Sequence, residues 1–128
     1  MRLSKSSIND RAAWEAINVK LPQFDIDEVA KNTKEKPQWV HFGAGNIFRG
    51  FIANAHQKLL DSGKANTGII AVESFDFEVI DKVYKPFDNL TLLVLMNADG
   101  RFDKTVVASI PEAITADKNR AEDYNRLI

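Results

Sequence analysis

Two glycines separated by one residue, Gly43 and Gly45, stand between an apolar run and a stretch of helical periodicity. The apolar run, residues 39–42, is bounded by Pro37 and Gly43, which is typical of a short buried strand. Residues 47–62 follow with apolar side chains at the spacing of one helix face, namely Phe48, Phe51, Ile52, Ala55, Leu59 and Leu60. A strand, a tight turn and a helix in this order indicate an α/β layer.

The same alternation continues downstream. Residues 67–73 predict a second strand, and the apolar spacing over residues 77–84 predicts another short helix. Residues 90–96 are nearly all apolar, as in a strand that is buried on both faces of a parallel sheet. The turn signal at residues 97–100 then predicts that residues 104–110 return as the second arm of a hairpin. We therefore expect parallel pairing of the first three strands, with a hairpin added after the third.

The first 36 residues read differently from the rest. Residues 7–18 predict a short helix, which Pro22 ends because proline does not fit inside a helix. Asp25 or Asp27 can cap a brief second helix, and the polar residues 33–37 predict a linker. We therefore divide the chain into a helical lead-in, residues 1–36, and a folded domain, residues 37–128.

Composition excludes several classes of protein. The chain has 128 residues with 17 basic and 18 acidic side chains, and a net charge of −1 argues against a dedicated nucleic-acid binder. No apolar run approaches the roughly 18–20 residues of a membrane span, and the N-terminus has no secretory signal. The absence of cysteine excludes disulfides, thiolate zinc sites and cysteine nucleophiles. A cytoplasmic protein without nucleic-acid or membrane partners is expected.

The glycine turn carries the main functional signal. A Gly-x-Gly turn that joins a strand to a helix is the context of a dinucleotide fingerprint. The first glycine permits the sharp turn, and the second lets a pyrophosphate approach the backbone at the helix N-terminus, beside Asn46 as a helix cap. The third fingerprint position is usually glycine or alanine and is Phe48 here. A tight turn without any nucleotide therefore stays open. With a nucleotide, the fold class is Rossmann-like α/β: a mostly parallel sheet with flanking helices and a hairpin, an incomplete doubly wound domain.

An acidic residue ends the second predicted strand. Glu73 lies thirty residues after Gly43, where a carboxylate can accept hydrogen bonds from an adenosine ribose diol. Asp76 and Glu78 follow without a nearby arginine, so a 2′-phosphate would meet only negative charge. This pattern favours NAD over NADP. The alternatives are a solvated strand end for Glu73 and a helix cap for Asp76.

The stretch Trp-Val-His-Phe-Gly-Ala-Gly-Asn-Ile-Phe-Arg-Gly-Phe, residues 39–51, resembles the nucleotide-binding start of the long-chain mannitol dehydrogenase family. The resemblance extends upstream to Leu-Pro-Gln-Phe-Asp at residues 21–25. Downstream it includes residues 92–95, 99–100 and 107–110. It implies an NAD cofactor held by Gly43, Ala44, Gly45, Asn46, Ile47, Phe48, Arg49 and Glu73. Arg49 would contact cofactor phosphate or brace the substrate domain, against the simpler interpretation of an exposed helix charge.

The resemblance also implies which substrates and residues to expect. Phe48 favours the hexuronate and free-polyol branches, because the phosphate-specific member usually has glycine there. The leading substrate pair is D-mannonate/D-fructuronate. The alternatives are mannitol 2-dehydrogenase, mannitol-1-phosphate 5-dehydrogenase, a nucleotide-binding module without chemistry, and a domain that binds S-adenosylmethionine.

The family's catalytic lysine, asparagine and histidine lie in a C-terminal domain, which would also bind the small-molecule substrate, and no such motif occurs here. We therefore expect no catalytic residue and no metal site in this chain, with His41 and His56 as packed structural residues. Asp117 or Thr115 can cap a last helix, whose apolar side includes Ala121 and Tyr124. This helix ends on Leu127 and Ile128 without a stop signal, which predicts a truncated chain that is inactive by itself. The oligomeric state is not indicated.

Overall fold

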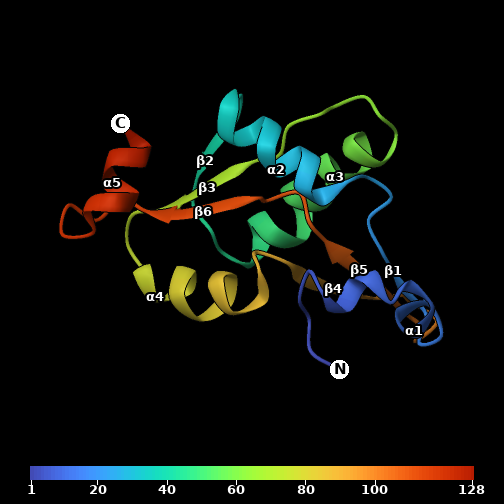
Figure 1. Ribbon diagram of the computed structural model, residues 1–128. Coiled ribbons are helices and arrows are strands. Elements are labelled where there is room, and N and C mark those ends of the chain that lie inside the picture. Colours follow the sequence, from blue (N-terminus) through green and yellow to red (C-terminus); the bar gives the residue numbers. More distant parts are fainter.

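Two three-stranded sheets organise the computed structural model, which describes residues 1–128 (Figure 1). The strands are β1 (Val19–Lys20), β2 (Val40–Phe42), β3 (Ile70–Glu73), β4 (Thr91–Met96), β5 (Phe102–Val107) and β6 (Glu112–Thr115). The α-helices are α1 (Arg11–Glu15), α2 (Ile26–Glu35), α3 (Ala53–Asp61), α4 (Phe77–Val79) and α5 (Ala121–Leu127). Two π-helical turns, Phe48–Ile52 and Ile80–Tyr84, lead into α3 and follow α4, and two 3-10 turns occupy Ser7–Asn9 and Lys85–Phe87. None of the helices has both the length and the apolar character needed to cross a bilayer.

The first sheet is parallel and has the order β2-β3-β6. Val40 lies opposite Ile70, which in turn lies opposite Glu112. β2 is connected to β3 through helices, and β3 to β6 through a helical segment and the hairpin of β4 and β5, so this sheet resembles one half of a doubly wound fold with an added hairpin. The prediction of a mostly parallel α/β layer with flanking helices and an added hairpin is therefore confirmed.

The third strand of the parallel sheet is not the one that the sequence predicted. Residues 90–96 were expected to fill that place, but β4 pairs antiparallel with β5 in the second sheet, whose order is β1-β5-β4. The place beside β3 is taken by β6, a strand that the apolar pattern did not predict. The expected burial of residues 90–96 on both faces was also wrong, since Leu92 is 41% and Met96 73% exposed. β4 is an edge strand, so one of its sides has no neighbour.

β2 is likewise an edge strand, paired only with β3. The prediction that residues 39–42 form a strand is confirmed, but the predicted burial was wrong, because Val40 and Phe42 are exposed. Both side chains lie on the sheet face opposite to that of His41, in line with the alternation along a strand.

The lead-in, residues 1–36, packs against the second sheet. It contributes β1, which pairs parallel with β5, so that Val19 lies opposite Lys104. Its α2 extends to Glu35, into the linker that was expected at residues 33–37. Asp25 caps this helix by accepting from the Glu28 N–H. The lead-in and the second sheet share one core cluster: Ile8, Trp14, Val19, Leu21, Leu90, Val106 and Ala108. The domain boundary at residue 36 stays a prediction.

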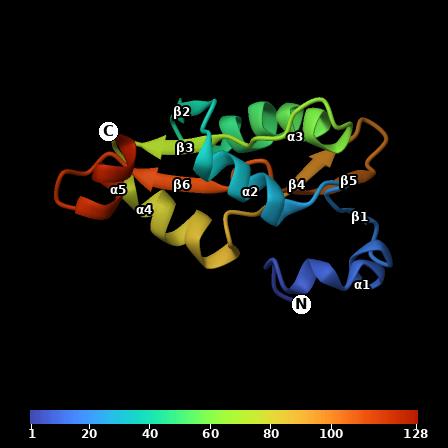
Figure 2. The same ribbon diagram turned by 45° about the horizontal axis from the view of Figure 1, so that its top comes forward.

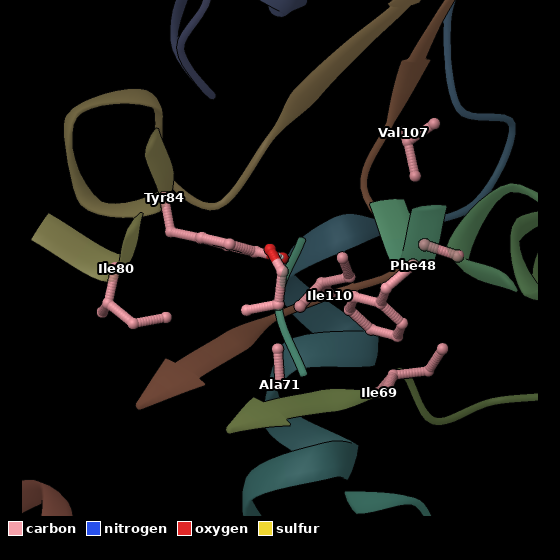
Figure 3. Close-up of a cluster of buried hydrophobic side chains, with 9 residues drawn as sticks. Phe48, Ile69, Ala71, Ile80, Tyr84, Val107 and Ile110 are labelled. Atoms are coloured by element: carbon pink, nitrogen blue, oxygen red, sulfur yellow. Dashed lines mark hydrogen bonds between the residues drawn. The ribbon is translucent and has the colours of Figure 1, made fainter. Parts of the chain in front are cut away.

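The main core lies on the face of the parallel sheet that α3 and the segment after β3 cover. Figure 3 shows this cluster, with Ile80 and Tyr84 coming from one side and Phe48, Ile69 and Ile110 from the other. On the opposite face, Ile70, Val72 and Ile114 form a smaller cluster to which Leu127 of α5 is added. Figure 2 shows α5 and α4 near the same end of the sheet, with the hairpin of β4 and β5 at the far end. The sheet thus presents the carboxyl ends of β2 and β3 side by side.

Candidate functional site

The glycine turn begins where β2 ends. Gly43 has φ of +112°, a backbone conformation that a residue with a side chain rarely adopts. Its N–H donates to the Val72 carbonyl at 2.8 Å, which ties the turn to the neighbouring strand β3. His41 supports the turn from below, since its Nδ1 donates to the Gly43 carbonyl at 3.0 Å. The sharp turn predicted for Gly43 is therefore present and is held from two sides.

Gly45 follows in open surroundings. A Cβ built on Gly45 would meet no atom within 4 Å, so the space above this residue is free. The first helical turn starts here, because the Arg49 N–H donates to the Gly45 carbonyl at 3.1 Å. The Gly45 N–H itself has no partner in the chain. A free amide and free space at a helix N-terminus form a location that can receive an anion.

Asn46 does not cap the helix, in contrast to the prediction. Its side-chain oxygen accepts a hydrogen bond from the Arg49 guanidinium instead, and no side chain caps the helical turn that follows. An arginine one turn away outcompetes the backbone amide for this oxygen, because hydrogen bonds with a charged donor are stronger than those with a neutral one.

The Ala44 carbonyl lies beneath the turn and accepts two hydrogen bonds. The Tyr84 hydroxyl donates to it at 3.0 Å, and Arg49 Nη1 donates at 3.0 Å. The Arg49 guanidinium also lies over the Tyr84 ring, 5.6 Å from its centre. Arg49 is therefore not a free helix charge, and its guanidinium faces the inner side of the turn.

Glu73 lies beside the glycine turn, as its predicted role requires. One carboxylate oxygen accepts from the Ala44 N–H at 3.3 Å, and the other accepts from the N–H groups of Phe75 and Asp76 at 3.0 and 3.4 Å. A carboxylate offers about four acceptor positions, so about one remains for a further donor such as a ribose hydroxyl. Asp76 occupies the position before α4, but its side chain makes no capping hydrogen bond, which contradicts the predicted cap.

The two remaining predicted site residues, Ile47 and Phe48, differ in exposure. Phe48 is only 4% exposed, and its ring is stacked on that of His41 with the ring centres 4.2 Å apart. Its side chain therefore belongs to the core, and the contact with a cofactor predicted for Phe48 would have to come from its backbone. Ile47, one residue earlier, is 81% exposed on the first helical turn.

Gly50 faces the hairpin rather than the strand before the turn. A Cβ on Gly50 would lie 3.4 Å from Cδ1 of Leu93 in β4. This is an ordinary van der Waals distance, so Gly50 does not supply the close helix–strand packing of the third fingerprint glycine.

Both histidines have structural surroundings. His56 is buried, its Nε2 donates to the Thr67 carbonyl at 2.7 Å, and its ring meets Trp39 edge-on. His41 is half-buried between Phe48 and the turn. No group of three or more histidine, cysteine, aspartate or glutamate side chains is arranged to hold a metal ion.

The turn and Glu73 together present two chemical features at one edge of the sheet. The free Gly45 amide at a helix start suits a phosphate, and the remaining acceptor capacity of Glu73 suits a hydroxyl. The donor set therefore fits a dinucleotide. Sequence reasoning missed Tyr84 as part of this site, since it was assigned only to the apolar side of a helix. The signal available was a tyrosine in an apolar stripe, because a buried hydroxyl needs a hydrogen-bond partner.

Comparisons with known proteins agree with this fold. No family model matches the sequence. A D-mannonate oxidoreductase from Thermotoga maritima is 57% identical over 122 residues, which are 95% of this chain but 23% of that protein. The chain thus spans about a quarter of the length of the curated relative that it matches.

Two solved structures share the fold. A D-sorbitol dehydrogenase in substrate-free form superposes with a TM-score of 0.76 at 24% identity, over 100% of this chain and 25% of that one. A Pseudomonas fluorescens mannitol 2-dehydrogenase, in a ternary complex with NAD and D-mannitol, gives 0.72 at 19% identity, over 95% of this chain and 23% of that one. The chain is thus similar in sequence to about a quarter of a D-mannonate oxidoreductase, and it shares its fold with parts of two polyol dehydrogenases of solved structure.

Proposed function

We propose that this chain binds NAD and serves as the nucleotide-binding part of a polyol or aldonate oxidoreductase. The observation that carries the proposal is the placement of Glu73 next to the glycine turn, 3.3 Å from the Ala44 N–H. Gly45 would receive the pyrophosphate at its free amide, and Glu73 would accept from the adenosine ribose. The mannitol 2-dehydrogenase of the same fold is a complex with NAD, which supports this choice of cofactor.

Selectivity for NAD over NADP follows from charge. The carboxylates of Glu73, Asp76 and Glu78 come close together in the sequence after β3. Lys82, four residues after Glu78, is paired with it at 2.9 Å. A 2′-phosphate on the ribose would be repelled by the Glu73 carboxylate. We therefore expect NADP to bind more weakly than NAD.

The reaction that we propose is hydride transfer between NAD and a secondary alcohol, with D-mannonate and D-fructuronate as the leading pair. The 57% identity to a D-mannonate oxidoreductase supports this pair over mannitol and mannitol 1-phosphate. NAD supplies the hydride acceptor when it is bound. The residues of this chain bind and orient the dinucleotide. The groups that contact the small-molecule substrate would come from the remaining three-quarters of such a protein.

Titration calorimetry with the 128-residue chain tests the cofactor proposal. NAD should bind, NADP should bind more weakly, and S-adenosylmethionine should not bind. Gly45→Ala should reduce the NAD affinity at least tenfold, about 1.4 kcal/mol, because its Cβ fills the space for the pyrophosphate. The thermal midpoint should stay unchanged, since that Cβ meets no protein atom within 4 Å.

Gly100→Ala is the control for the site, because Gly100 lies in the turn between β4 and β5 and also has no neighbour within 4 Å of its Cβ position. Its φ of +85° strains an alanine, so this variant should lower the thermal midpoint, unlike Gly45→Ala. It should leave the NAD affinity unchanged. Binding of S-adenosylmethionine without NAD would refute the proposed function. Equal loss of affinity in both glycine variants would refute the proposed location.

The substrate is tested in a chimera that joins this chain to the part of the Thermotoga maritima relative that it does not span. The chimera should form NADH with D-mannonate, measured by absorbance, and Gly45→Ala should raise the KM for NAD at least tenfold. Activity with D-mannitol but not with D-mannonate would exclude the leading substrate pair.

A further inference from the structure

Two side chains from different parts of the sequence converge on one carbonyl group, that of Ala44. The Tyr84 hydroxyl and Arg49 Nη1 each donate to this oxygen at 3.0 Å. Arg49 comes from the helical turn after the glycines, whereas Tyr84 ends the helical segment that follows β3. Both acceptor positions of this carbonyl are therefore used, and its direction is set from the interior of the protein.

The direction of the Ala44 carbonyl determines where the next amide points. No peptide bond in the chain is cis, so the carbonyl of Ala44 and the N–H of Gly45 point in opposite directions across one planar unit. Because the carbonyl faces Tyr84 in the core, the Gly45 N–H faces outward. This amide has no hydrogen-bond partner in the chain, and a Cβ placed on Gly45 would meet no atom within 4 Å.

Tyr84 is well suited to hold this carbonyl. It is 1% exposed, and Figure 3 shows its ring extending from its helical turn into the cluster that contains Ile80 and Ala71. Burial raises the pKa of the Tyr84 hydroxyl to about 12, so this group remains a protonated donor throughout the physiological range. A rigid ring in a packed core holds its hydroxyl in a narrow range of positions.

Arg49 completes the support. Its second guanidinium nitrogen donates to the Asn46 side chain, and its charge lies over the Tyr84 ring. The guanidinium is therefore held by the ring and by two oxygens, one on each side of Gly45 in the sequence. Its planar fork suits such a double contact better than a lysine ammonium would.

We propose that Tyr84 and Arg49 are positioning residues, which hold the Ala44–Gly45 peptide so that the Gly45 N–H points at the dinucleotide pyrophosphate. This inference rests on the proposed NAD function. Neither residue needs to touch the cofactor for this role, because each acts through the Ala44 carbonyl. Loss of one donor frees the peptide to rotate, and binding must then restrict it again.

Tyr84→Phe tests the inference, because it removes only the hydroxyl and keeps the ring in the core. The matched control is Tyr124→Phe in α5, whose hydroxyl makes no hydrogen bond in the chain. NAD and ADP should each bind about fivefold more weakly to Tyr84→Phe, the loss expected for one neutral hydrogen bond. Adenosine, which lacks the pyrophosphate, should bind equally well to the wild type and to both variants.

A structural role alone would lower the thermal midpoint without changing the ratio of ADP to adenosine affinity. An unchanged ratio in Tyr84→Phe therefore overturns the inference. Arg49→Gln provides the second variant and should lower the same ratio of ADP to adenosine affinity. In the double variant the two losses should not add up fully, because both donors hold the same peptide.

The amide spectrum of the ¹⁵N-labelled chain without nucleotide separates this inference from the proposed function. Tyr84→Phe should shift the Gly45 amide resonance, whereas Tyr124→Phe should leave it in place. An unshifted Gly45 resonance overturns the positioning role even if NAD binds. If the Gly45 resonance shifts but the chain binds no NAD, the positioning role of Tyr84 is supported and the proposed ligand is refuted.

Discussion

The side chain of Gln57 substitutes for a missing strand, and Gln57→Leu tests this. β1 pairs with β5 only as far as Thr105. Just beyond that point, the Gln57 amide nitrogen donates to the Val106 carbonyl at 2.8 Å, and its oxygen accepts from the Ala108 N–H at 2.6 Å. A parallel strand would pair with the same two groups around Val107. Leucine has a similar volume but offers neither partner.

The size of the effect follows from what Gln57→Leu leaves behind. Val106 is 0% and Ala108 3% exposed, so water does not reach the carbonyl and the N–H that lose their partners. A buried polar group without a partner costs about 1–3 kcal/mol, so two such groups should lower the free energy of unfolding by about 2–6 kcal/mol. This is a large share of the roughly 5–15 kcal/mol typical of a domain.

Urea unfolding, followed by circular dichroism, measures this loss as a lower midpoint at an unchanged slope. Gln38→Leu serves as the control, since Gln38 is exposed and makes no side-chain hydrogen bond, and it should stay within about 0.5 kcal/mol of the wild type. If Gln57→Leu also stays within that range, then these two hydrogen bonds do not hold α3 against β5, and our reasoning is refuted.

Two further predictions concern packing and pH. Gly68→Ala should lower the free energy of unfolding by about 1–3 kcal/mol in thermal melts, because its Cβ would lie 2.4 Å from Pro111 Cδ and 2.7 Å from the Ser109 carbonyl; a melt equal to that of Gly45→Ala would contradict this. The hydrogen bonds from Arg120 hold the pKa of Asp81 below its ordinary value of 3.8, so the ion pair stabilises the fold above that pH and is lost as the pH falls through the lower folded value. The thermal midpoint of Asp81→Asn should accordingly fall below that of the wild type at pH 6 and match it near pH 2, whereas an equal difference at both pH values would exclude this pairing.

Local sequence signals predicted the elements of the candidate site well. A proline before the apolar run and glycines after it predicted a strand, a sharp turn and a helix, and the structure has these at β2, Gly43 and the helical segment that begins beside Gly45. Glu73 was expected at the end of the second strand and does lie there, against the turn. These features depend on φ preferences and on short-range spacing, which the sequence expresses directly.

The side-chain partners at the site could not be predicted in the same way. The expected cap by Asn46 was wrong because Arg49 takes its oxygen. Tyr84 joins the turn from 40 residues away, and nothing in its local surroundings indicates that its hydroxyl would meet Ala44. Such contacts depend on how two helical segments are placed over the sheet.

Strand pairing divides what the sequence determined from what the tertiary structure decided. The sequence alone determined the α/β class, the glycine turn, the acidic residue at the second strand and the hairpin of β4 and β5. Only the tertiary structure decided that the apolar residues 90–96 leave the parallel sheet and that the less apolar β6 takes the place beside β3. Hydrophobicity reports how much apolar surface a segment has to bury, whereas the choice of neighbour depends on which edges remain free once the other elements have packed. In this chain β5 forms the centre of the second sheet between β1 and β4, and the edge of β3 is left for β6.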